Sequence, residues 1–260
     1  MADEQSYNMG DAHYQETAAQ FFREEKQLTF TARHIQPGQR VLDVGCGPGI
    51  ATISLAELVG TSGSVEGVDA DPAMVAVAER RASTADVHDR VHHRVADALA
   101  LPFAANTFNA VRSERLFQHL SDPSAALAEM LRVSCPGGWI VVLDADYSSI
   151  TVDSDQTDIE RRIALAAAQS VRSGYVARTL YRMFTDQGLA GISVTVRPVT
   201  LTKYAFARGS LLDLIEPGAL ASGLVTVAEL HSWHAELEQA DARNVFFACL
   251  NMILVSGCKP

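Results

Sequence analysis

The sequence predicts an α/β protein in which helices cover both faces of a mostly parallel β-sheet. Strand-like apolar segments alternate with helix-like segments from about residue 40 to residue 146, and this alternation is typical of a parallel sheet. The chain has 260 residues, 48% of them hydrophobic and 20% charged, which is ordinary for a folded domain with a substantial core. We therefore expect one α/β domain.

The elements of the alternating region can be placed in order along the chain. Five strands are predicted at RVLDVG, SVEGVDA, VHHRVADA, FNAVRSE and GWIVVLDAD, with helices over 50–59, 72–84 and 123–134. Asp71 and Pro72 suit the N-cap and the first position of the second helix.

After the fifth strand, the regular alternation of strands and helices ends. The segments 153–173, 175–188 and 207–241 are predicted as helices, and a last strand lies within 244–257. Pro198 places the strand ISVTVRPVTLTKY at a sheet edge or a bulge. We expect a helical cap over the carboxyl edge of the sheet, formed by residues 1–36 and by insertions near 147–175 and 205–241 of a domain that spans 37–260.

Charge and composition argue against several classes of function. The formal net charge is −10 without a Lys/Arg cluster, so nucleic acid is a poor partner. No apolar run reaches the roughly 18 residues of a membrane span, and the N-terminus lacks the features of a signal peptide, so we expect a cytoplasmic protein. The four cysteines have neither metal-site spacing nor the density of a disulfide scaffold, and no metal is expected.

A glycine-rich turn joins the first strand to its helix. Gly45, Gly47 and Gly49 leave the backbone bare, so that a ligand can approach its N–H groups. The third glycine comes one residue earlier than in the dinucleotide-binding pattern, and Asp43 precedes the turn, where a pyrophosphate would fit poorly. A ligand with an ammonium and a carboxylate fits this charge better; a tight turn without a ligand is the alternative.

Carboxylates also follow the next two predicted strands. Asp69 could accept hydrogen bonds from a ribose diol, and Asp97 with Ala98 could contact an adenine edge. Together with the glycine turn, these sites describe an adenosine joined to an amino acid, as in S-adenosylmethionine. Taken singly, Asp69 could instead cap the following helix, and Asp97 could be a turn residue.

The chain resembles the class I S-adenosylmethionine-dependent methyltransferases in four segments: VLDVGCGPG, GVDADPAMVAVA, ADALALPFAANTFNAV and HLSDPSAALAEMLRVSCPGGWIVV. Within this family, the motifs are most similar to those of quinone-biosynthesis C-methyltransferases and small-molecule methyltransferases. The resemblance covers residues 37 to 146 well. It implies a Rossmann-like, seven-stranded sheet whose last strand is antiparallel. It also implies methyl transfer with S-adenosylhomocysteine as the second product.

The resemblance further implies which residues contact the cofactor. They are Gly45, Cys46 and Gly47 at the methionine end, Asp69 and Ala70 at the ribose, Met74, Asp97 and Ala98 at the adenine, and the stretch from Ser113 to Arg115. Tyr14 could close over the methionine end, as in some relatives. Core packing is the alternative for Met74 and Tyr14, and a solvated ion pair is the alternative for Glu114 and Arg115.

His119 follows the fourth strand, on the wall where this fold presents its acceptor. Because imidazole titrates near neutral pH, His119 is the candidate general base; a helix-end histidine that bonds the backbone is the alternative. His231 and His234 share one face of an inserted helix, which we interpret as solvated, with substrate contact as the alternative.

The inserted segments supply more apolar side chains than a lid over a charged metabolite needs. They are Tyr181, Phe184, Tyr204, Phe206, Leu211, Leu212, Leu214 and Ile215. This favours a small apolar or aromatic acceptor, methylated on oxygen or carbon, with nitrogen left open; packing of the cap or a homodimer interface is the alternative. A cyclase-like enzyme that binds the cofactor without transferring its methyl group is the rival function.

Overall fold

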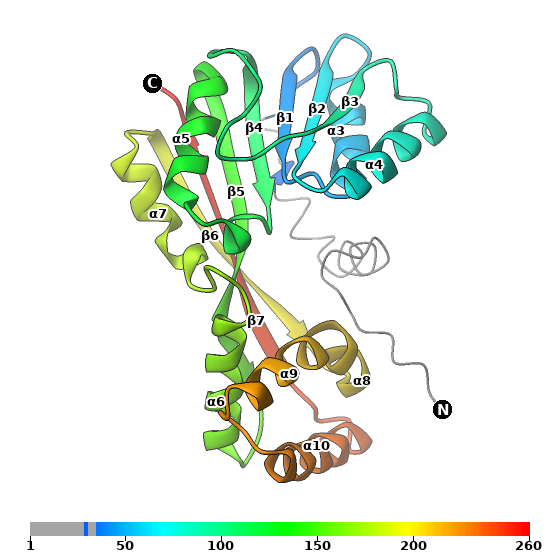
Figure 1. Ribbon diagram of the computed structural model, residues 1–260, viewed down its shortest axis with the longest axis vertical. Coiled ribbons are helices and arrows are strands. Elements are labelled where there is room, and N and C mark those ends of the chain that lie inside the picture. Colours follow the sequence, from blue (N-terminus) through cyan, green and yellow to red (C-terminus); the bar gives the residue numbers. More distant parts are fainter. Residues whose placement is uncertain (1–28, 31–34) are drawn as a thin grey trace.

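The computed structural model describes residues 29–30 and 35–260 of the chain. In this part, seven strands form one sheet in the order β3-β2-β1-β4-β5-β7-β6 (Figure 1). The strands are β1 (Arg40–Val44), β2 (Ser64–Asp69), β3 (Val91–Val95), β4 (Phe108–Glu114), β5 (Ser134–Val152), β6 (Ala190–Leu201) and β7 (Ala248–Cys258). Strands β1 to β5 pair in parallel, whereas β7 pairs antiparallel with both β5 and β6. The predicted sheet is confirmed.

Helices cover both faces of the parallel part of the sheet. On one face, α3 (Ile50–Val59) and α4 (Pro72–Thr84) share a core with the first strands, in which Leu55 and Val41 are fully buried. On the other face, α5 (Pro123–Val133) and α7 (Val176–Asp186) pack through side chains such as Leu127 and Leu180. Burial of these apolar faces on the sheet provides the main driving force for folding.

Two of these helices begin with the same local signal. Asp71 accepts a hydrogen bond from Ala73 N at 2.8 Å, and Asp122 accepts one from Ala125 N at 2.9 Å. A proline follows each aspartate at the first helical position, where its missing N–H costs nothing. The predicted start at Asp71 and Pro72 is confirmed.

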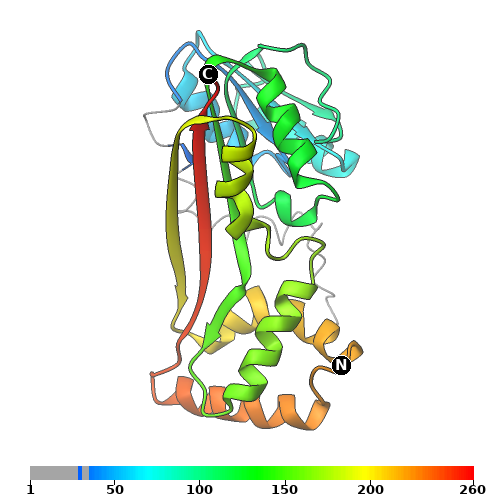
Figure 2. The same ribbon diagram turned by 90° about the vertical axis from the view of Figure 1, so that its left-hand side faces the viewer.

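The three strands β5, β6 and β7 continue beyond the others and carry a second group of helices (Figures 1 and 2). This helical lobe (residues 148–169 and 199–250) contains α6 (Thr157–Gln169), α8 (Tyr204–Ala207), the π-helical turn η2 (Arg208–Leu212), α9 (Asp213–Ala221) and α10 (Val227–Ala242). It has its own core, in which Trp233 and Ile163 are fully buried. The lobe lies past the carboxyl ends of β1 and β4.

Several boundaries differ from those the sequence predicts. The fifth strand does not end at Asp146: Thr151 and Val152 still pair with Cys249 and Ala248 of β7. The helix predicted over 153–173 is shorter, and the helical segment predicted over 207–241 is broken between α9 and α10. The edge position of the strand that contains Pro198 is confirmed, because β6 is the last strand of the sheet.

Most of the N-terminal segment predicted as helical, residues 1–36, lies outside the described residues. Within residues 29–30 and 35–260, no helix has the length and apolar character that crossing a membrane requires.

Candidate functional site

The turn after β1 has a backbone that only glycine adopts easily. Gly45, Gly47 and Gly49 have φ angles of 75°, 53° and 75°. A Cβ at Gly49 would lie 2.8 Å from Ala78 Cβ in α4, too close for a side chain, whereas a Cβ at Gly47 would meet no atom of the described residues within 4 Å. The turn therefore packs tightly against α4 at one end and presents an open backbone at Gly47.

Asp69 holds this turn from the end of β2. Its Oδ2 accepts a hydrogen bond from Gly47 N at 2.8 Å, and its Oδ1 accepts one from Asp71 N at 3.0 Å. The N-cap of α4 is Asp71, so Asp69 is not the helix cap that the sequence left open. Asp69 thus joins the glycine turn to the loop after β2.

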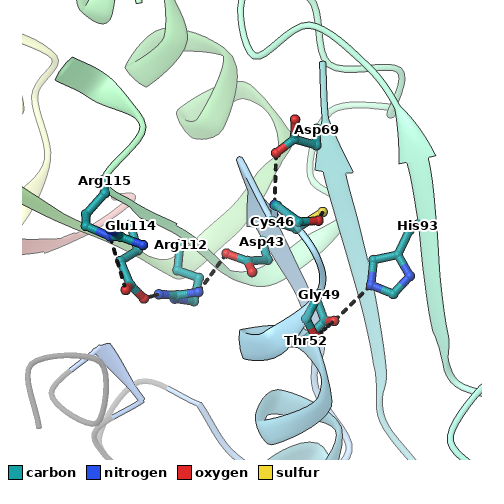
Figure 3. A network of polar contacts seen from close by, with 10 residues as sticks. Asp43, Cys46, Gly49, Thr52, Asp69, His93, Arg112, Glu114 and Arg115 are labelled. Atoms are coloured by element: carbon teal, nitrogen blue, oxygen red, sulfur yellow. Dashed lines mark hydrogen bonds and ion pairs between the residues drawn. The ribbon is translucent and has the colours of Figure 1, made fainter. Parts of the chain in front are cut away.

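A fully buried ion-pair chain lies beneath the turn (Figure 3). The Arg112 guanidinium donates to Asp43 Oδ1 at 2.7 Å and to Glu114 Oε2 at 2.6 Å, and only 1% of its side chain is exposed. Burial opposes the positive charge, but the two carboxylates outweigh this and hold the pKa of Arg112 above its usual value. The sequence reasoning missed Arg112, although an arginine within the apolar run of FNAVRSE was a usable signal.

A second polar chain supports the far end of the turn (Figure 3). The Thr52 hydroxyl lies 2.9 Å from Gly49 O and 2.8 Å from His93 Nε2, and His93 Nδ1 lies 3.0 Å from Glu79 Oε1. Burial lowers the pKa of His93, so the imidazole is neutral at pH 7. The glycine turn is therefore fixed from both sides by polar side chains of β2, β3, α3 and α4.

The residues around the turn leave a small open space of about 40 Å³. Its lining consists of Asp43, Gly45, Cys46, Gly47, Pro48, Ile50, Ala51, Arg112, Glu114 and Arg115. Enclosing small-molecule sites hold roughly 300 Å³ or more. The described residues therefore supply the floor of a site, with two carboxylates and two guanidiniums in it.

The end of β4 contributes Ser113 and Arg115. Ser113 is fully buried, and its Oγ has no hydrogen-bond partner among the described residues. Arg115 has a φ angle of 53°, and its N–H donates to Leu143 O at 2.8 Å. This backbone turns the chain from β4 into the short helix η1 (Phe117–His119).

His119 ends η1 with an exposed side chain. Its Nε2 lies 2.9 Å from the amide nitrogen of Gln118. The protein packed around the ring and the charge of Arg115 lower the pKa of His119, so the ring is neutral at pH 7 and able to accept a proton.

Asp144 of β5 is a buried carboxyl group behind η1, which the sequence reasoning missed. It accepts hydrogen bonds from Gln118 N at 3.3 Å and from Ala145 N at 3.0 Å. Burial raises its pKa to about 7 in spite of these bonds. An aspartate inside the apolar run of GWIVVLDAD was the available signal, but the run alone does not say which side chains face the site.

The remaining predicted contacts lie along the ends of β2 and β3. These two ends meet, because Ala96 N donates to Asp69 O at 2.9 Å. Asp97 is exposed and accepts a hydrogen bond from Leu99 N at 2.9 Å, as a turn residue does. Ala70 is exposed, Met74 and Ala98 are buried, and Tyr14 lies outside the described residues.

The interpretation of His231 and His234 as a solvated face is wrong for one of them. His231 is exposed, but His234 is buried, with its Nδ1 2.8 Å from Tyr204 OH. Four of the eight apolar residues of the insertions are buried in the core of the lobe itself, namely Tyr204, Leu211, Leu212 and Ile215, and Phe184 is buried in the core under α7. They therefore no longer argue for an apolar acceptor.

Replacing the buried acid is expected to change how stability depends on pH. The folded pKa of Asp144 is about 7 against an ordinary value of 3.8, so folding favours the protonated group. This contribution to stability is complete below about pH 4 and is lost as the pH rises through about 7. Between pH 5 and pH 8, the wild-type protein should lose at least about 1 kcal/mol of stability relative to Asp144→Asn.

Urea unfolding at the two pH values measures this difference, and any constant cost of the substitution cancels. Asp89→Asn, at a carboxylate whose side chain is 70% exposed, is the control and should follow the wild type. Parallel pH dependence of wild type and Asp144→Asn would show that Asp144 is charged in the folded protein.

Comparisons with known proteins agree with this geometry. A family model described as a methyltransferase domain matches residues 41–138, from β1 into β5. The chain is 35% identical to a demethylmenaquinone methyltransferase of Symbiobacterium thermophilum over 43% of this chain and 45% of that protein. It is 32% identical to an uncharacterized 37.1 kDa transposon protein of Streptomyces fradiae over 90% of this chain and 66% of that protein. The chain thus spans between about half and two thirds of these relatives.

Among solved structures, the fold is similar to that of a methyltransferase-like protein of Bacillus halodurans, with a TM-score of 0.65 and 15% identity over 91% of this chain and 99% of that one. At this identity the similarity concerns the fold alone. The family model covers the part of the chain that contains the glycine turn, Asp69 and Arg112.

Proposed function

Because this chain belongs to the class I S-adenosylmethionine-dependent methyltransferases, we propose that it transfers a methyl group to a small apolar or aromatic metabolite, on oxygen or carbon. The cofactor of the family is S-adenosylmethionine. The observation that carries the proposal is the charged floor at the glycine turn. The acceptor class is supported by the name of the quinone-related relative, whose match covers 43% of this chain.

The residues at the turn fit the cofactor. Asp43 and Glu114 lie beside Arg112 and Arg115, so the floor carries both signs of charge and suits an amino-acid group, which is itself an ammonium and a carboxylate. The open backbone at Gly47 would hold this group, and Asp69 at the end of β2 would hold the ribose. When bound, the cofactor supplies an electrophilic methyl group on a sulfonium sulfur.

The chain's own part is to align the acceptor, exclude water and remove a proton. Arg112 and Asp69 keep the floor and the turn rigid. His119 would accept the proton of a hydroxyl or acidic carbon, and its lowered pKa keeps it in the basic form.

We propose that the cap consists of residues 1–36 and the insertions near 147–175 and 205–241, beside the domain spanning 37–260. Among the described residues, the turn before α7 contacts both neighbours of His119: Ser173 N donates to Gln118 O at 2.8 Å, and Ser173 Oγ donates to Leu120 O at 3.2 Å. The helices α8 to α10 lie farther along β5 (Figure 1).

The test is release of S-adenosylhomocysteine from the purified protein with S-adenosylmethionine and a panel of acceptors: a reduced naphthoquinone, a catechol and a primary amine. We expect release with the first two. Release with the amine alone would overturn the choice of methylated atom. Conversion of a polyene without any release would favour the cyclase-like alternative.

Asp69→Ala is expected to weaken binding of S-adenosylmethionine and S-adenosylhomocysteine by about 5- to 150-fold, or roughly 1–3 kcal/mol. The substitution removes the acceptor for the ribose hydroxyls and also releases Gly47 N. Isothermal titration calorimetry measures the effect. Asp71→Ala is the matched control: it removes the N-cap of α4, which costs about 1 kcal/mol of stability, and should leave the dissociation constant unchanged. An unchanged constant for Asp69→Ala would remove Asp69 from the site.

A further inference from the structure

The helical lobe contains a cavity of about 430 Å³ between η2, α9 and α10. This volume is within the range of small-molecule sites. The lining residues are Arg208, Glu216, Leu220, Val227, Leu230, His231, His234, Ala235 and Glu238. Six of them form one stripe along α10, because their spacing follows the helical repeat: Val227, Leu230, His231, His234, Ala235 and Glu238.

A buried hydrogen-bond chain forms one wall of the cavity. His234 Nδ1 lies 2.8 Å from Tyr204 OH, and its Nε2 lies 3.0 Å from Glu216 Oε2. His234 is 8% exposed and Glu216 is 7% exposed. Burial of such a chain is costly unless every polar atom is paired, so its position beside a cavity indicates a ligand site.

One polar atom of this hydrogen-bond chain has no partner among the described residues. Glu216 Oε1 is buried and has no hydrogen-bond partner among residues 29–30 and 35–260. A carboxylate oxygen can only accept hydrogen bonds, so the atom that completes this group must be a donor. Glu216 therefore requires an N–H or O–H from a molecule next to it.

The charge of the lining selects the kind of donor. Glu216 and Glu238 are both carboxylates of the cavity wall. Arg208 is the guanidinium of the lining. It donates to Asp213 Oδ1 at 2.6 Å and to Tyr204 OH at 3.2 Å, and its Nη2 lies 4.0 Å from Glu216 Oε2, so one guanidinium faces the two carboxylates. The cavity thus has a surplus of negative charge on one side, and Leu220, Val227 and Leu230 form an apolar side.

This cavity is separate from the glycine turn. Val44 at the end of β1 is in register with Ser113 of β4, and Ser113 with Val142 of β5. From Val142, β5 continues for ten residues to Val152, or roughly 30 Å at about 3.3 Å per residue, before it reaches the lobe. Figure 1 shows α9 and α10 at the opposite end of the molecule from β1 to β3.

We propose that this cavity is a second binding site, for a small organic cation: a protonated amine with an apolar body. The ammonium donates to Glu216, with Glu238 as a second carboxylate nearby. The apolar body lies against the leucine and valine side chains. The site is independent of methyl transfer at the glycine turn.

Three probes of the same size and different charge test the proposal: 2-phenylethylamine, 2-phenylethanol and 3-phenylpropionate. Titration into the ¹⁵N-labelled full chain should give saturable amide shifts in α9 and α10 with the amine. The alcohol and the carboxylate should bind at least about tenfold more weakly. Glu216→Gln should weaken amine binding at least about tenfold, whereas Glu57→Gln on the exposed face of α3 should not.

Leu220→Trp, at an exposed rim position, narrows the cavity without replacing a member of the hydrogen-bond chain, and it should weaken amine binding at least about tenfold even if Glu216→Gln unfolds the lobe. Equal binding of all three probes would overturn the charge assignment. Shifts confined to the glycine turn, or no shifts in α9 and α10 up to about 10 mM amine, would overturn the site itself. Binding of S-adenosylmethionine, measured on the same samples, reports separately on the proposed function.

Discussion

Arg112→Met is expected to lower the free energy of unfolding by about 3–5 kcal/mol, because it leaves the carboxylates of Asp43 and Glu114 buried without the cation between them. Both carboxylates are largely buried, with 2% and 6% of their side chains exposed, so water in the small space beside them compensates for only part of the lost guanidinium. Methionine fills a similar volume, which separates the loss of charge from the creation of a cavity. Urea unfolding at pH 7 measures the difference.

Arg94→Met is the matched control for this substitution. Arg94 also pairs with a glutamate, Glu66, but 45% of its side chain is exposed, so its removal should cost less than about 1 kcal/mol. A similar small cost for Arg112→Met would mean that Asp43 and Glu114 are protonated or hydrated in the folded protein. The charged floor of the glycine turn would then not exist as described.

His119→Gln is expected to lower turnover by roughly 10²- to 10⁴-fold while cofactor affinity stays nearly unchanged, because proton removal matters only in the chemical step. The loss should shrink as the pH rises toward the pKa of the acceptor, about 10 for a phenol, since solvent then supplies the missing deprotonation. The test compares the wild type and His119→Gln. It measures the rate of S-adenosylhomocysteine release at several pH values and the dissociation constant of the cofactor.

His88→Gln is the control, since His88 is exposed in the loop before the edge strand β3, whereas His119 follows the carboxyl end of the central strand β4. Near-normal turnover of His119→Gln would return His119 to a structural role at the end of η1. So would a fall in cofactor affinity or melting temperature in proportion to the activity. In that case the acceptor is already acidic, or another group removes the proton.

The parallel half of the fold could be predicted from the sequence because its signals are local. The glycines of the turn, the Asp–Pro helix starts at Asp71 and Asp122, and the apolar runs of the strands each act within a few residues. The end of β5 could not be predicted in this way. Ser148 and Ser149 interrupt the apolar run, and the short segment from Ile150 to Val152 continues the same strand only through β7, about 100 residues later in the chain.

The buried charges show the same limit. Asp43 and Arg112 are 69 residues apart in the sequence, so neither segment reveals that the other neutralises it. His234 was placed on a solvated helix face together with His231, which lies three residues before it. It is buried because Tyr204 and Glu216, 30 and 18 residues away, pack against it. Helical periodicity identifies a face, but the partner of that face comes from tertiary contacts.

The most direct test of the account is a calorimetric titration of the purified chain with S-adenosylmethionine, S-adenosylhomocysteine and NAD. We expect saturable binding of the first two and none of NAD, because the glycine turn carries Asp43 and a floor of mixed charge that suits an amino-acid group and disfavours a pyrophosphate. Saturable binding of NAD, with no binding of either sulfur compound, would contradict it.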